Sequence, residues 1–125
     1  KDLAMHLDED ALKLHLSTVP SNTIGGQLWC IVGARESYIK AIERGIWSGF
    51  SCSLKDPSSK NEVLKCLDHT YNKLLDFIDQ NLTETQTTFL FDLLEHEIQH
   101  HGQLIRFVYG NHLTFPISWK KRYTV

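Results

Sequence analysis

The sequence predicts an all-α protein, an up-and-down-type four-helix bundle whose first helix is short or truncated. Three observations predict this class. Three long segments repeat apolar residues at helical spacing, capping and stop residues flank these segments, and no segment alternates apolar and polar residues as a strand does. The 125 residues suffice for one domain, residues 1–125, with its own hydrophobic core.

The first 20 residues give the weakest helix signal. Asp8 is a suitable cap for a short helix through Leu14 or Leu16, and Pro20 ends it. Because the sequence starts at Lys1, we expect it to be a fragment, or to lack residues that were not recorded. The first helix of the predicted bundle is therefore nearly absent.

The first long helix is predicted to follow Ser21-Asn22-Thr23, whose side-chain oxygens are suitable caps, and to run through Arg44. Gly45 is a natural residue just past its end. The apolar stripe of this helix consists of Ile24, Leu28, Ile31, Tyr38 and Ile42. Residues 46–57 form a connecting loop with two large apolar side chains, Trp47 and Phe50, which are expected to pack as a lid or in the core.

Two more long helices follow. The second starts at Pro57-Ser58-Ser59, and its stripe consists of Leu64, Leu67, Tyr71, Leu74 and Ile78. The third runs from about Gln86 to Tyr109, with Gly110-Asn111 as the stop signal. Ser118 is a plausible cap for a last helical turn, Trp119 to Arg122. Short to medium connections between long helices predict antiparallel neighbours.

Charge and cysteine usage exclude several classes. The net charge is −2, and only Lys120-Lys121-Arg122 cluster, so nucleic acid is an unsuitable partner. No run of 18 or more apolar residues predicts a membrane span, and the first residues contain no signal-peptide core. Three cysteines, Cys30, Cys52 and Cys66, lack any CxxC spacing, which predicts reduced thiols and a cytoplasmic protein. A disulfide between Cys30 and Cys52 is left open.

Histidine is the residue that points to chemistry. Two of the seven histidines, His96 and His100, are four residues apart on the third long helix and therefore project side by side. Neutral imidazole is a common ligand for zinc, nickel, copper and iron. A catalytic site needs a third protein ligand and an open position. The alternative is that both histidines are merely packed or solvent-facing.

A helical projection places Leu90, Leu94, Ile98, Ile105 and Val108 at the centre of the apolar arc of this helix. His96 and His100 lie on its shoulder. Glu97 falls inside the arc, where it is a candidate general base or a hydrogen-bond acceptor for an imidazole, or else a long side chain that reaches solvent. His101 also falls inside the arc and is expected to be a hydrogen-bonded core residue.

The stretch HEIQHHGQ, residues 96–103, resembles the signature of the DinB/YfiT-like superfamily, in which a histidine pair precedes a Gly-Gln step. Two other segments are similar to the same family. They are TIGGQLWCIVGARE, residues 23–36, and FPISWKKRY, residues 115–123. The resemblance extends from about Pro20 to the C-terminus, and it is carried by the order and spacing of the three segments together.

That resemblance implies a four-helix bundle, often a homodimer, in which three histidines hold a divalent metal ion, here zinc or nickel. His96 and His100 match two of them, whereas Cys30 stands where the family has the third. A thiolate is a sound zinc ligand, so Cys30 is one candidate for the third ligand. Cysteine is also a small, commonly buried residue, so the alternative is that Cys30 is a core thiol that has closed the site. The nearly absent first helix leaves a groove, which favours a dimer.

Two functions are consistent with this resemblance. The first is a metal-dependent enzyme, a small-thiol-dependent transferase or a metal-assisted hydrolase, with a low-molecular-weight thiol as an implied cofactor. The second is a non-catalytic bundle with a degenerate metal site that acts through dimerisation or through a small-molecule ligand. The role of Cys30 separates the two.

Overall fold

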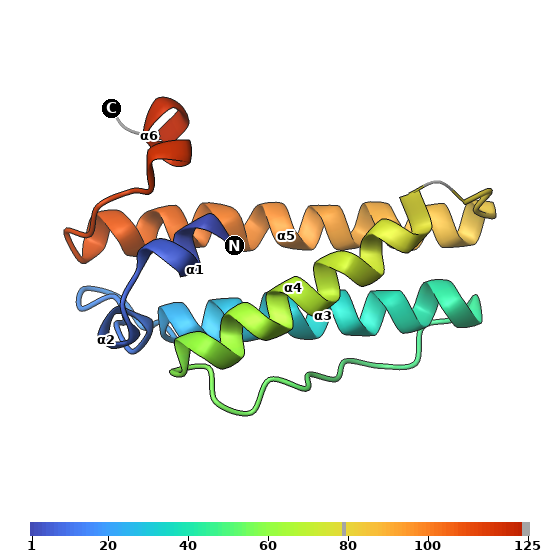
Figure 1. The fold of residues 1–125 in the computed structure, drawn as a ribbon, viewed down its shortest axis with the longest axis horizontal. Helices are drawn as coiled ribbons and strands as arrows, with labels where there is room; N and C mark the ends of the chain where they lie inside the picture. The colour runs from blue at the N-terminus through green and yellow to red at the C-terminus, as the bar shows by residue number, and fades with distance from the viewer. Residues whose placement is uncertain (79, 124–125) are drawn as a thin grey trace.

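Helices are the regular secondary structure of this protein, as the sequence predicts. The computed structural model describes residues 1–78 and 80–123, and in these residues one isolated bridge, between His15 and Thr23, is the only β-type pairing. Figure 1 shows the six helices of this part of the chain, which are α1 (Asp2–His6), α2 (Glu9–Leu12), α3 (Ile24–Arg44), α4 (Lys60–Ile78), α5 (Glu84–Gly110) and α6 (Ile117–Tyr123). Within the described ranges, no helix is both long enough and apolar enough to cross a lipid bilayer.

The two ends of α3 are where the sequence places them. Thr23 caps the helix, since its Oγ1 accepts a hydrogen bond from the backbone N–H of Gly26 at 3.0 Å. Gly45 follows the last helical residue with φ of 71°, a left-handed conformation that glycine adopts without a steric penalty. Both predicted boundaries of this helix are confirmed.

The longest helix, α5, begins two residues earlier than predicted. Thr83 and Gln86 form a capping box, in which each side chain bonds the backbone N–H of the other residue. Gln86 also donates to the backbone oxygen of Ile42 at 2.8 Å and so ties the start of α5 to the end of α3. The helix ends at Gly110, with Asn111 as its cap, which agrees with the predicted stop signal.

The short helices differ from the prediction in detail. Asp8 caps α2 by accepting from the N–H of Ala11 at 2.8 Å, but α2 ends at Leu12, before the predicted Leu14 or Leu16. The prediction that Ser118 caps the last helix is wrong. Ser118 lies inside α6, and its hydroxyl instead donates to Asp2 at 2.7 Å, which links α6 to α1.

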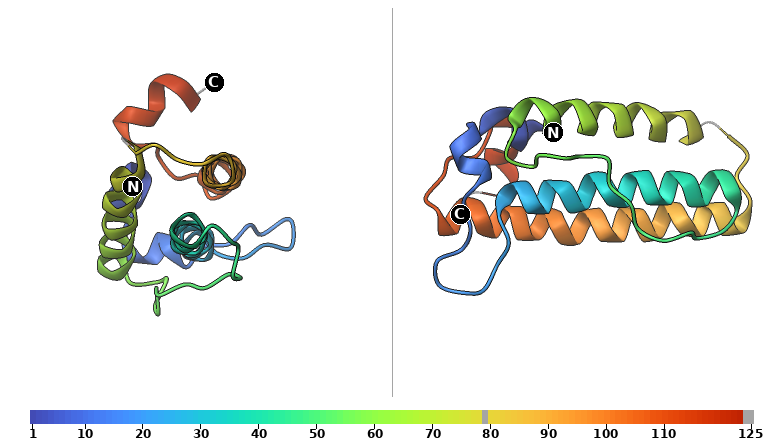
Figure 2. Two further views of the ribbon diagram at one scale, coloured as in Figure 1. Left: turned by 90° about the vertical axis from the view of Figure 1, so that its right-hand side faces the viewer. Right: turned by 90° about the horizontal axis from the view of Figure 1, so that it is seen from below.

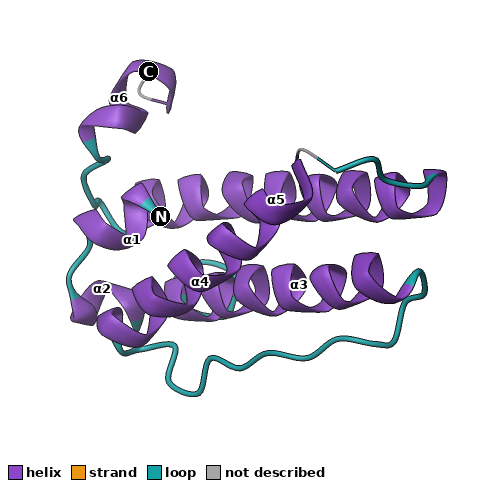
Figure 3. Cartoon of the chain, turned by 45° about the vertical axis from the view of Figure 1, so that its right-hand side comes forward, coloured by secondary structure: helices purple, strands orange, loops and turns teal. Residues whose placement is uncertain are grey.

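The helix directions differ from an up-and-down bundle at one connection. Figures 1 and 2 show that α4 runs in the same direction as α3, whereas α5 runs opposite to both. The cause is the loop of residues 45–59, which returns along the length of α3 before α4 begins (Figure 3). A helix of 21 residues is about 32 Å long, and 15 extended residues span about 50 Å, so the loop is long enough for this return.

Two glycines of α3 let this loop lie close to the helix. A Cβ atom added at Gly25 would stand 2.2 Å from the backbone oxygen of Pro57, and one added at Gly33 would stand 2.3 Å from the ring of Phe50. The loop backbone is also hydrogen-bonded: Ser51 N–H donates to Ser37 Oγ at 2.9 Å. The loop therefore lies packed along α3. The ring of Phe50 contacts that of Trp29 at 5.3 Å between centroids, but Phe50 and Trp47 are 47% and 42% exposed, so these two side chains pack at the surface and not in the core.

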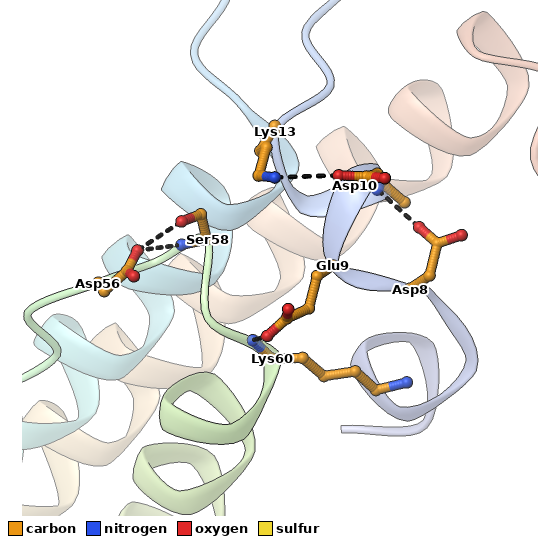
Figure 4. Close-up of polar contacts among 8 residues, drawn as sticks. Asp8, Glu9, Asp10, Lys13, Asp56, Ser58 and Lys60 are labelled. Carbon is orange, nitrogen blue, oxygen red and sulfur yellow. Dashed lines mark hydrogen bonds and ion pairs between the residues drawn. The ribbon is translucent and has the colours of Figure 1, made fainter.

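Polar contacts fix the start of α4 against the N-terminal helices (Figure 4). Glu9 accepts from the backbone N–H of Lys60, the first residue of α4, at 3.0 Å. A carboxylate at this place bonds an otherwise unpaired N–H and interacts favourably with the helix dipole. The ammonium of Lys60 in turn donates to the carbonyl oxygens of Met5 and Leu7.

The core consists of two apolar clusters with an ion pair between them. The larger cluster gathers α1, α2, and the first half of α3 with parts of α4 and α5, and the smaller one consists of Ile39, Ile42 and Phe77. Arg35, which lies between the two clusters along α3, forms an ion pair with Glu97 of α5. This half-buried ion pair thus joins α3 to α5 in the middle of the molecule.

The helical projection predicts the buried face of α5 only in part: Val108, placed at the centre of the apolar arc, is fully buried, but the middle of the helix differs. Leu94 and Ile98, placed at the centre of the apolar arc, are 54% and 61% exposed, while Leu93 and Phe107 on the shoulder are buried. The reason is that α5 and α4 each pack on α3 and stand apart from one another (Figure 2). The side of α5 that would face α4 in a closed bundle therefore faces a groove.

This groove, which we call the α4–α5 groove, encloses a cavity of about 390 Å³. Its walls include Leu67 from α4 and Leu94, Glu97 and Ile98 from α5, and Arg35 lies among the lining residues from α3. The helix α1 closes one end of the groove by packing on α4. An open groove is what the sequence predicts for a bundle with a nearly absent first helix.

Candidate metal centre

The two predicted ligands on α5 lie side by side. The ring centroids of His96 and His100 are 4.6 Å apart with an angle of 56° between the ring planes. This proximity follows from their spacing, because residues four apart stack on one face of an α-helix. Both side chains are half-buried beside α3, on the shoulder of α5 that the projection assigns to them.

A glutamine of α3 holds the ring of His100. Nδ1 of His100 lies 2.5 Å from Oε1 of Gln27, and Nε2 of Gln27 donates to Oδ1 of Asn22 at 2.6 Å. Since an amide oxygen only accepts, His100 Nδ1 must carry the proton. A neutral ring protonated at Nδ1 carries its lone pair on Nε2, which is the form that can bind a metal ion.

Electrostatics favour the neutral ring of His100. Burial lowers the pKa of His100 below its ordinary value, and the neighbouring His96 lowers it further. A hydrogen bond with Gln103 and the charge of Glu97 oppose the shift without reversing it. A lowered pKa helps a histidine to act as a ligand, because a proton does not then compete with the metal ion near neutral pH.

The ring of His96 has an unsatisfied buried nitrogen. In the described residues, its Nε2 is shielded from solvent and has no hydrogen-bond partner. A buried polar nitrogen without a partner costs free energy, typically about 1–3 kcal/mol. A metal ion is one partner that could satisfy such a nitrogen, and the ring of His100 lies 4.6 Å away between centroids.

The structure does not group the third predicted ligand with this pair. Cys30 is a free, half-buried thiol on α3, and burial raises its pKa, which disfavours the thiolate that zinc binds. Among residues 1–78 and 80–123, no three side chains of the His, Cys, Asp and Glu types are placed together as a metal site. The ligand set Cys30, His96 and His100 therefore stays a prediction, and its two histidines are the part with a supporting geometry.

The disulfide between Cys30 and Cys52, left open by the sequence, is not formed. All three cysteines are free thiols. The thiol of Cys52 instead donates to the backbone oxygen of Trp29 at 3.4 Å and belongs to the packed loop on α3.

Glu97, the candidate general base, is engaged elsewhere. Arg35 donates from Nε to Oε1 of Glu97 at 2.5 Å and from Nη2 to Oε2 at 2.9 Å, a bidentate pair. Glu97 also lines the α4–α5 groove, and neither His96 nor His100 does so. The pairing favours a structural role for Glu97 over a role in proton transfer at the histidines.

His101 lies apart from the pair, on the side of α5 that faces α6. Its ring packs against Trp119 at 4.4 Å and against Tyr123 at 5.2 Å between centroids. The ring is half-buried and lines the α4–α5 groove, so the predicted core position is confirmed only in part. The expected hydrogen bond is missing at Nε2, which is buried without a partner in the described part of the chain.

Sequence analysis missed two residues, Gln27 and Arg35. Both are polar residues on α3 that the structure turns toward α5, and Gln27 is only 6% exposed. The signals in the sequence were weak: Gln27 lies three residues before Cys30, and Arg35 lies four residues after the stripe residue Ile31. Their partners lie 73 and 62 residues away along the chain, beyond any local pattern.

Comparison of the chain with protein-family models, curated proteins and solved structures found no match.

Proposed function

We propose that this chain is a metal-binding helical domain of the DinB-like kind, in which His96 and His100 hold a divalent ion, zinc or nickel. The single observation that supports this most is the paired ring geometry. One imidazole has a buried Nε2 without a hydrogen-bond partner in the described residues, and the adjacent one has its Nδ1 bonded to Gln27, which leaves the lone pair of the neutral ring on Nε2. Two neutral imidazoles four residues apart on a helix are a frequent pair of metal ligands.

The proposed activity is that of a metal-dependent enzyme, a small-thiol-dependent transferase or a metal-assisted hydrolase. When bound, the ion supplies Lewis acidity, which lowers the pKa of a coordinated thiol or water. The residues of this chain contribute the rest: Gln27 orients His100, and α3 shields both rings on one side. Cys30 is proposed as the third ligand only on the strength of the family resemblance, and it must become a thiolate to bind.

The deciding experiment is metal analysis of protein purified without a histidine tag, followed by titration with Zn²⁺ and Ni²⁺. We expect close to one ion per chain, and we expect His96→Ala and His100→Ala each to abolish stoichiometric binding. Exposed His69 on α4 provides the matched control, since His69→Ala should leave binding unchanged. Wild-type protein that binds neither ion would refute the proposal.

The role of Cys30 is tested by replacing the bound ion with Co²⁺. A thiolate ligand adds an intense sulfur-to-metal charge-transfer band to the cobalt spectrum, and Cys30→Ser should then remove the band and weaken binding. A cobalt spectrum without this band, unchanged in Cys30→Ser, would make Cys30 a core thiol and the site a two-histidine one.

The α4–α5 groove favours a second candidate function, that of a non-catalytic bundle which acts through a dimer or a small-molecule ligand. Exposed Leu94 and Ile98 beside the cavity are the specific observation, because large exposed apolar surfaces often mark interfaces. A homodimer in light scattering that Ile98→Glu converts to a monomer, together with an absence of bound metal, would support this alternative over the enzyme.

The free state of all three cysteines is consistent with the proposed cytoplasmic location.

A further inference from the structure

The side chain of Gln27 is an unusual feature of the buried surface between α3 and α5. It is 6% exposed, and it belongs to a short list of buried polar residues in the described chain, with Ser37 and Thr70. Those two residues bond carbonyl oxygens of their own helices, as hydroxyl groups in helices commonly do. Gln27 instead bonds two other side chains, so its burial is explained by these partners.

The contacts of Gln27 determine which way its amide points. Its nitrogen donates to Oδ1 of Asn22, which lies just before α3, and its oxygen faces Nδ1 of His100. The backbone near Asn22 is itself fixed, because Thr23 caps α3 and Ile24 N–H donates to the carbonyl oxygen of Leu14 at 2.9 Å. The amide is thus anchored at one end and offers an acceptor to His100 at the other.

Gly26 makes room for this anchor. A Cβ atom added at Gly26 would lie 3.2 Å from Nδ2 of Asn22, which is tighter than ordinary van der Waals contact. The glycine therefore allows the Asn22 side chain to lie against the first turn of α3, within reach of Gln27 one turn later.

We propose that Gln27 is a positioning residue which, anchored by Asn22, fixes His100 as the Nδ1–H tautomer and so directs its Nε2 toward a metal ion shared with His96. This inference rests on the proposed metal-binding function and names a residue that acts on the ligand without touching the ion. Partners of this kind orient a ligating histidine, and their loss typically lowers metal affinity about 10- to 100-fold. The neutral ring of a histidine that lacks such a partner exchanges between the Nδ1–H and the Nε2–H tautomers.

Three variants test the proposal. Gln27→Leu keeps the approximate volume and removes the acceptor, whereas Gln27→Glu keeps an acceptor for Nδ1–H. Gln99→Leu, at an exposed position of α5 one residue from His100, is the matched control. Circular dichroism and urea unfolding establish that each variant is folded before the comparison.

The first measurement needs no metal. In ¹⁵N-histidine-labelled protein, long-range ¹H–¹⁵N correlation spectra distinguish the two tautomers of each ring, and His100→Asn identifies the signals of His100. We expect the Nδ1–H form of His100 in the wild type, in Gln27→Glu and in Gln99→Leu, and a mixture or the Nε2–H form in Gln27→Leu. A wild-type His100 in the Nε2–H form, or a spectrum unchanged by Gln27→Leu, would overturn the inference.

The second measurement is Zn²⁺ and Ni²⁺ affinity by calorimetry. We expect Gln27→Leu to weaken binding about 10- to 100-fold, and Gln27→Glu and Gln99→Leu to stay within a few-fold of the wild type. Equal affinity in Gln27→Leu and the wild type would also overturn the inference. If the wild type binds no metal, the proposed function fails on its own, and the tautomer spectra still decide whether Gln27 sets the state of His100.

Discussion

Removing the ion pair between Arg35 and Glu97 should cost this protein a measurable share of its stability. The pair is bidentate, with distances of 2.5 and 2.9 Å, and the two side chains are only 15% and 28% exposed. Solvent-exposed ion pairs contribute about 0.2–1 kcal/mol, whereas breaking a fully buried pair costs about 3–5 kcal/mol. The pair lies between these limits, so we expect Glu97→Gln to lower the free energy of unfolding by about 2 kcal/mol.

A double-mutant cycle isolates the interaction from other effects of each substitution. Arg35→Met keeps the apolar stem of the arginine, and Glu97→Gln keeps the shape of the glutamate. Urea unfolding of the wild type, both single variants and the double variant gives the coupling energy, which we expect to be about 1–2 kcal/mol. The exposed pair of Lys13 and Asp10 is the control, and Lys13→Met should not change the urea midpoint measurably.

Two results would refute this reasoning. Additive single variants, with a coupling below about 0.5 kcal/mol, would mean that the ion pair does not hold α3 to α5. A large loss of metal affinity in folded Glu97→Gln would mean that Glu97 serves the histidine pair, whereas the geometry predicts unchanged affinity because Arg35 occupies both carboxylate oxygens.

Three further predictions follow from local geometry and burial. Gly25→Ala should destabilise the protein by at least about 2 kcal/mol, because the added Cβ would overlap the carbonyl oxygen of Pro57. Gly102→Ala should stabilise the protein by about 0.5–1 kcal/mol, because the space around Gly102 is open and alanine favours the helix. The midpoints of urea unfolding check both signs. Burial lowers the pKa of His101 from 6.5, so the unfolded chain binds this proton more tightly and stability falls as the pH drops below about 6.5. His101→Phe should reduce this loss of stability between pH 7 and 5. An unchanged slope of unfolding free energy against pH in this variant would contradict the prediction. Thr83→Ala should cost about 1 kcal/mol in thermal or urea unfolding through loss of the capping box, and a change within error would mean that the start of α5 is held by tertiary contacts alone.

Local sequence signals predict the long helices and most of their ends, whereas the ends of the short helices differ from the prediction. Apolar spacing, Thr23 before α3 and Gly45 after it are local signals, because a helix is built from hydrogen bonds between residues four apart. The same locality placed His96 next to His100, since four residues make about one turn.

The packing of the helices on one another sets which side of each helix is buried and which side chains meet. The helical projection places Leu94 and Ile98 at the centre of the apolar arc of α5, yet both are exposed. The reason is that α4 packs on α3 and not on this part of α5, so these two side chains face the α4–α5 groove. The helix α4 runs in the same direction as α3 because the preceding loop returns along the length of α3 before α4 begins. Gln27 and Arg35 of α3 bond His100 and Glu97 of α5. These contacts join two helices, so the periodicity of either helix alone does not predict them.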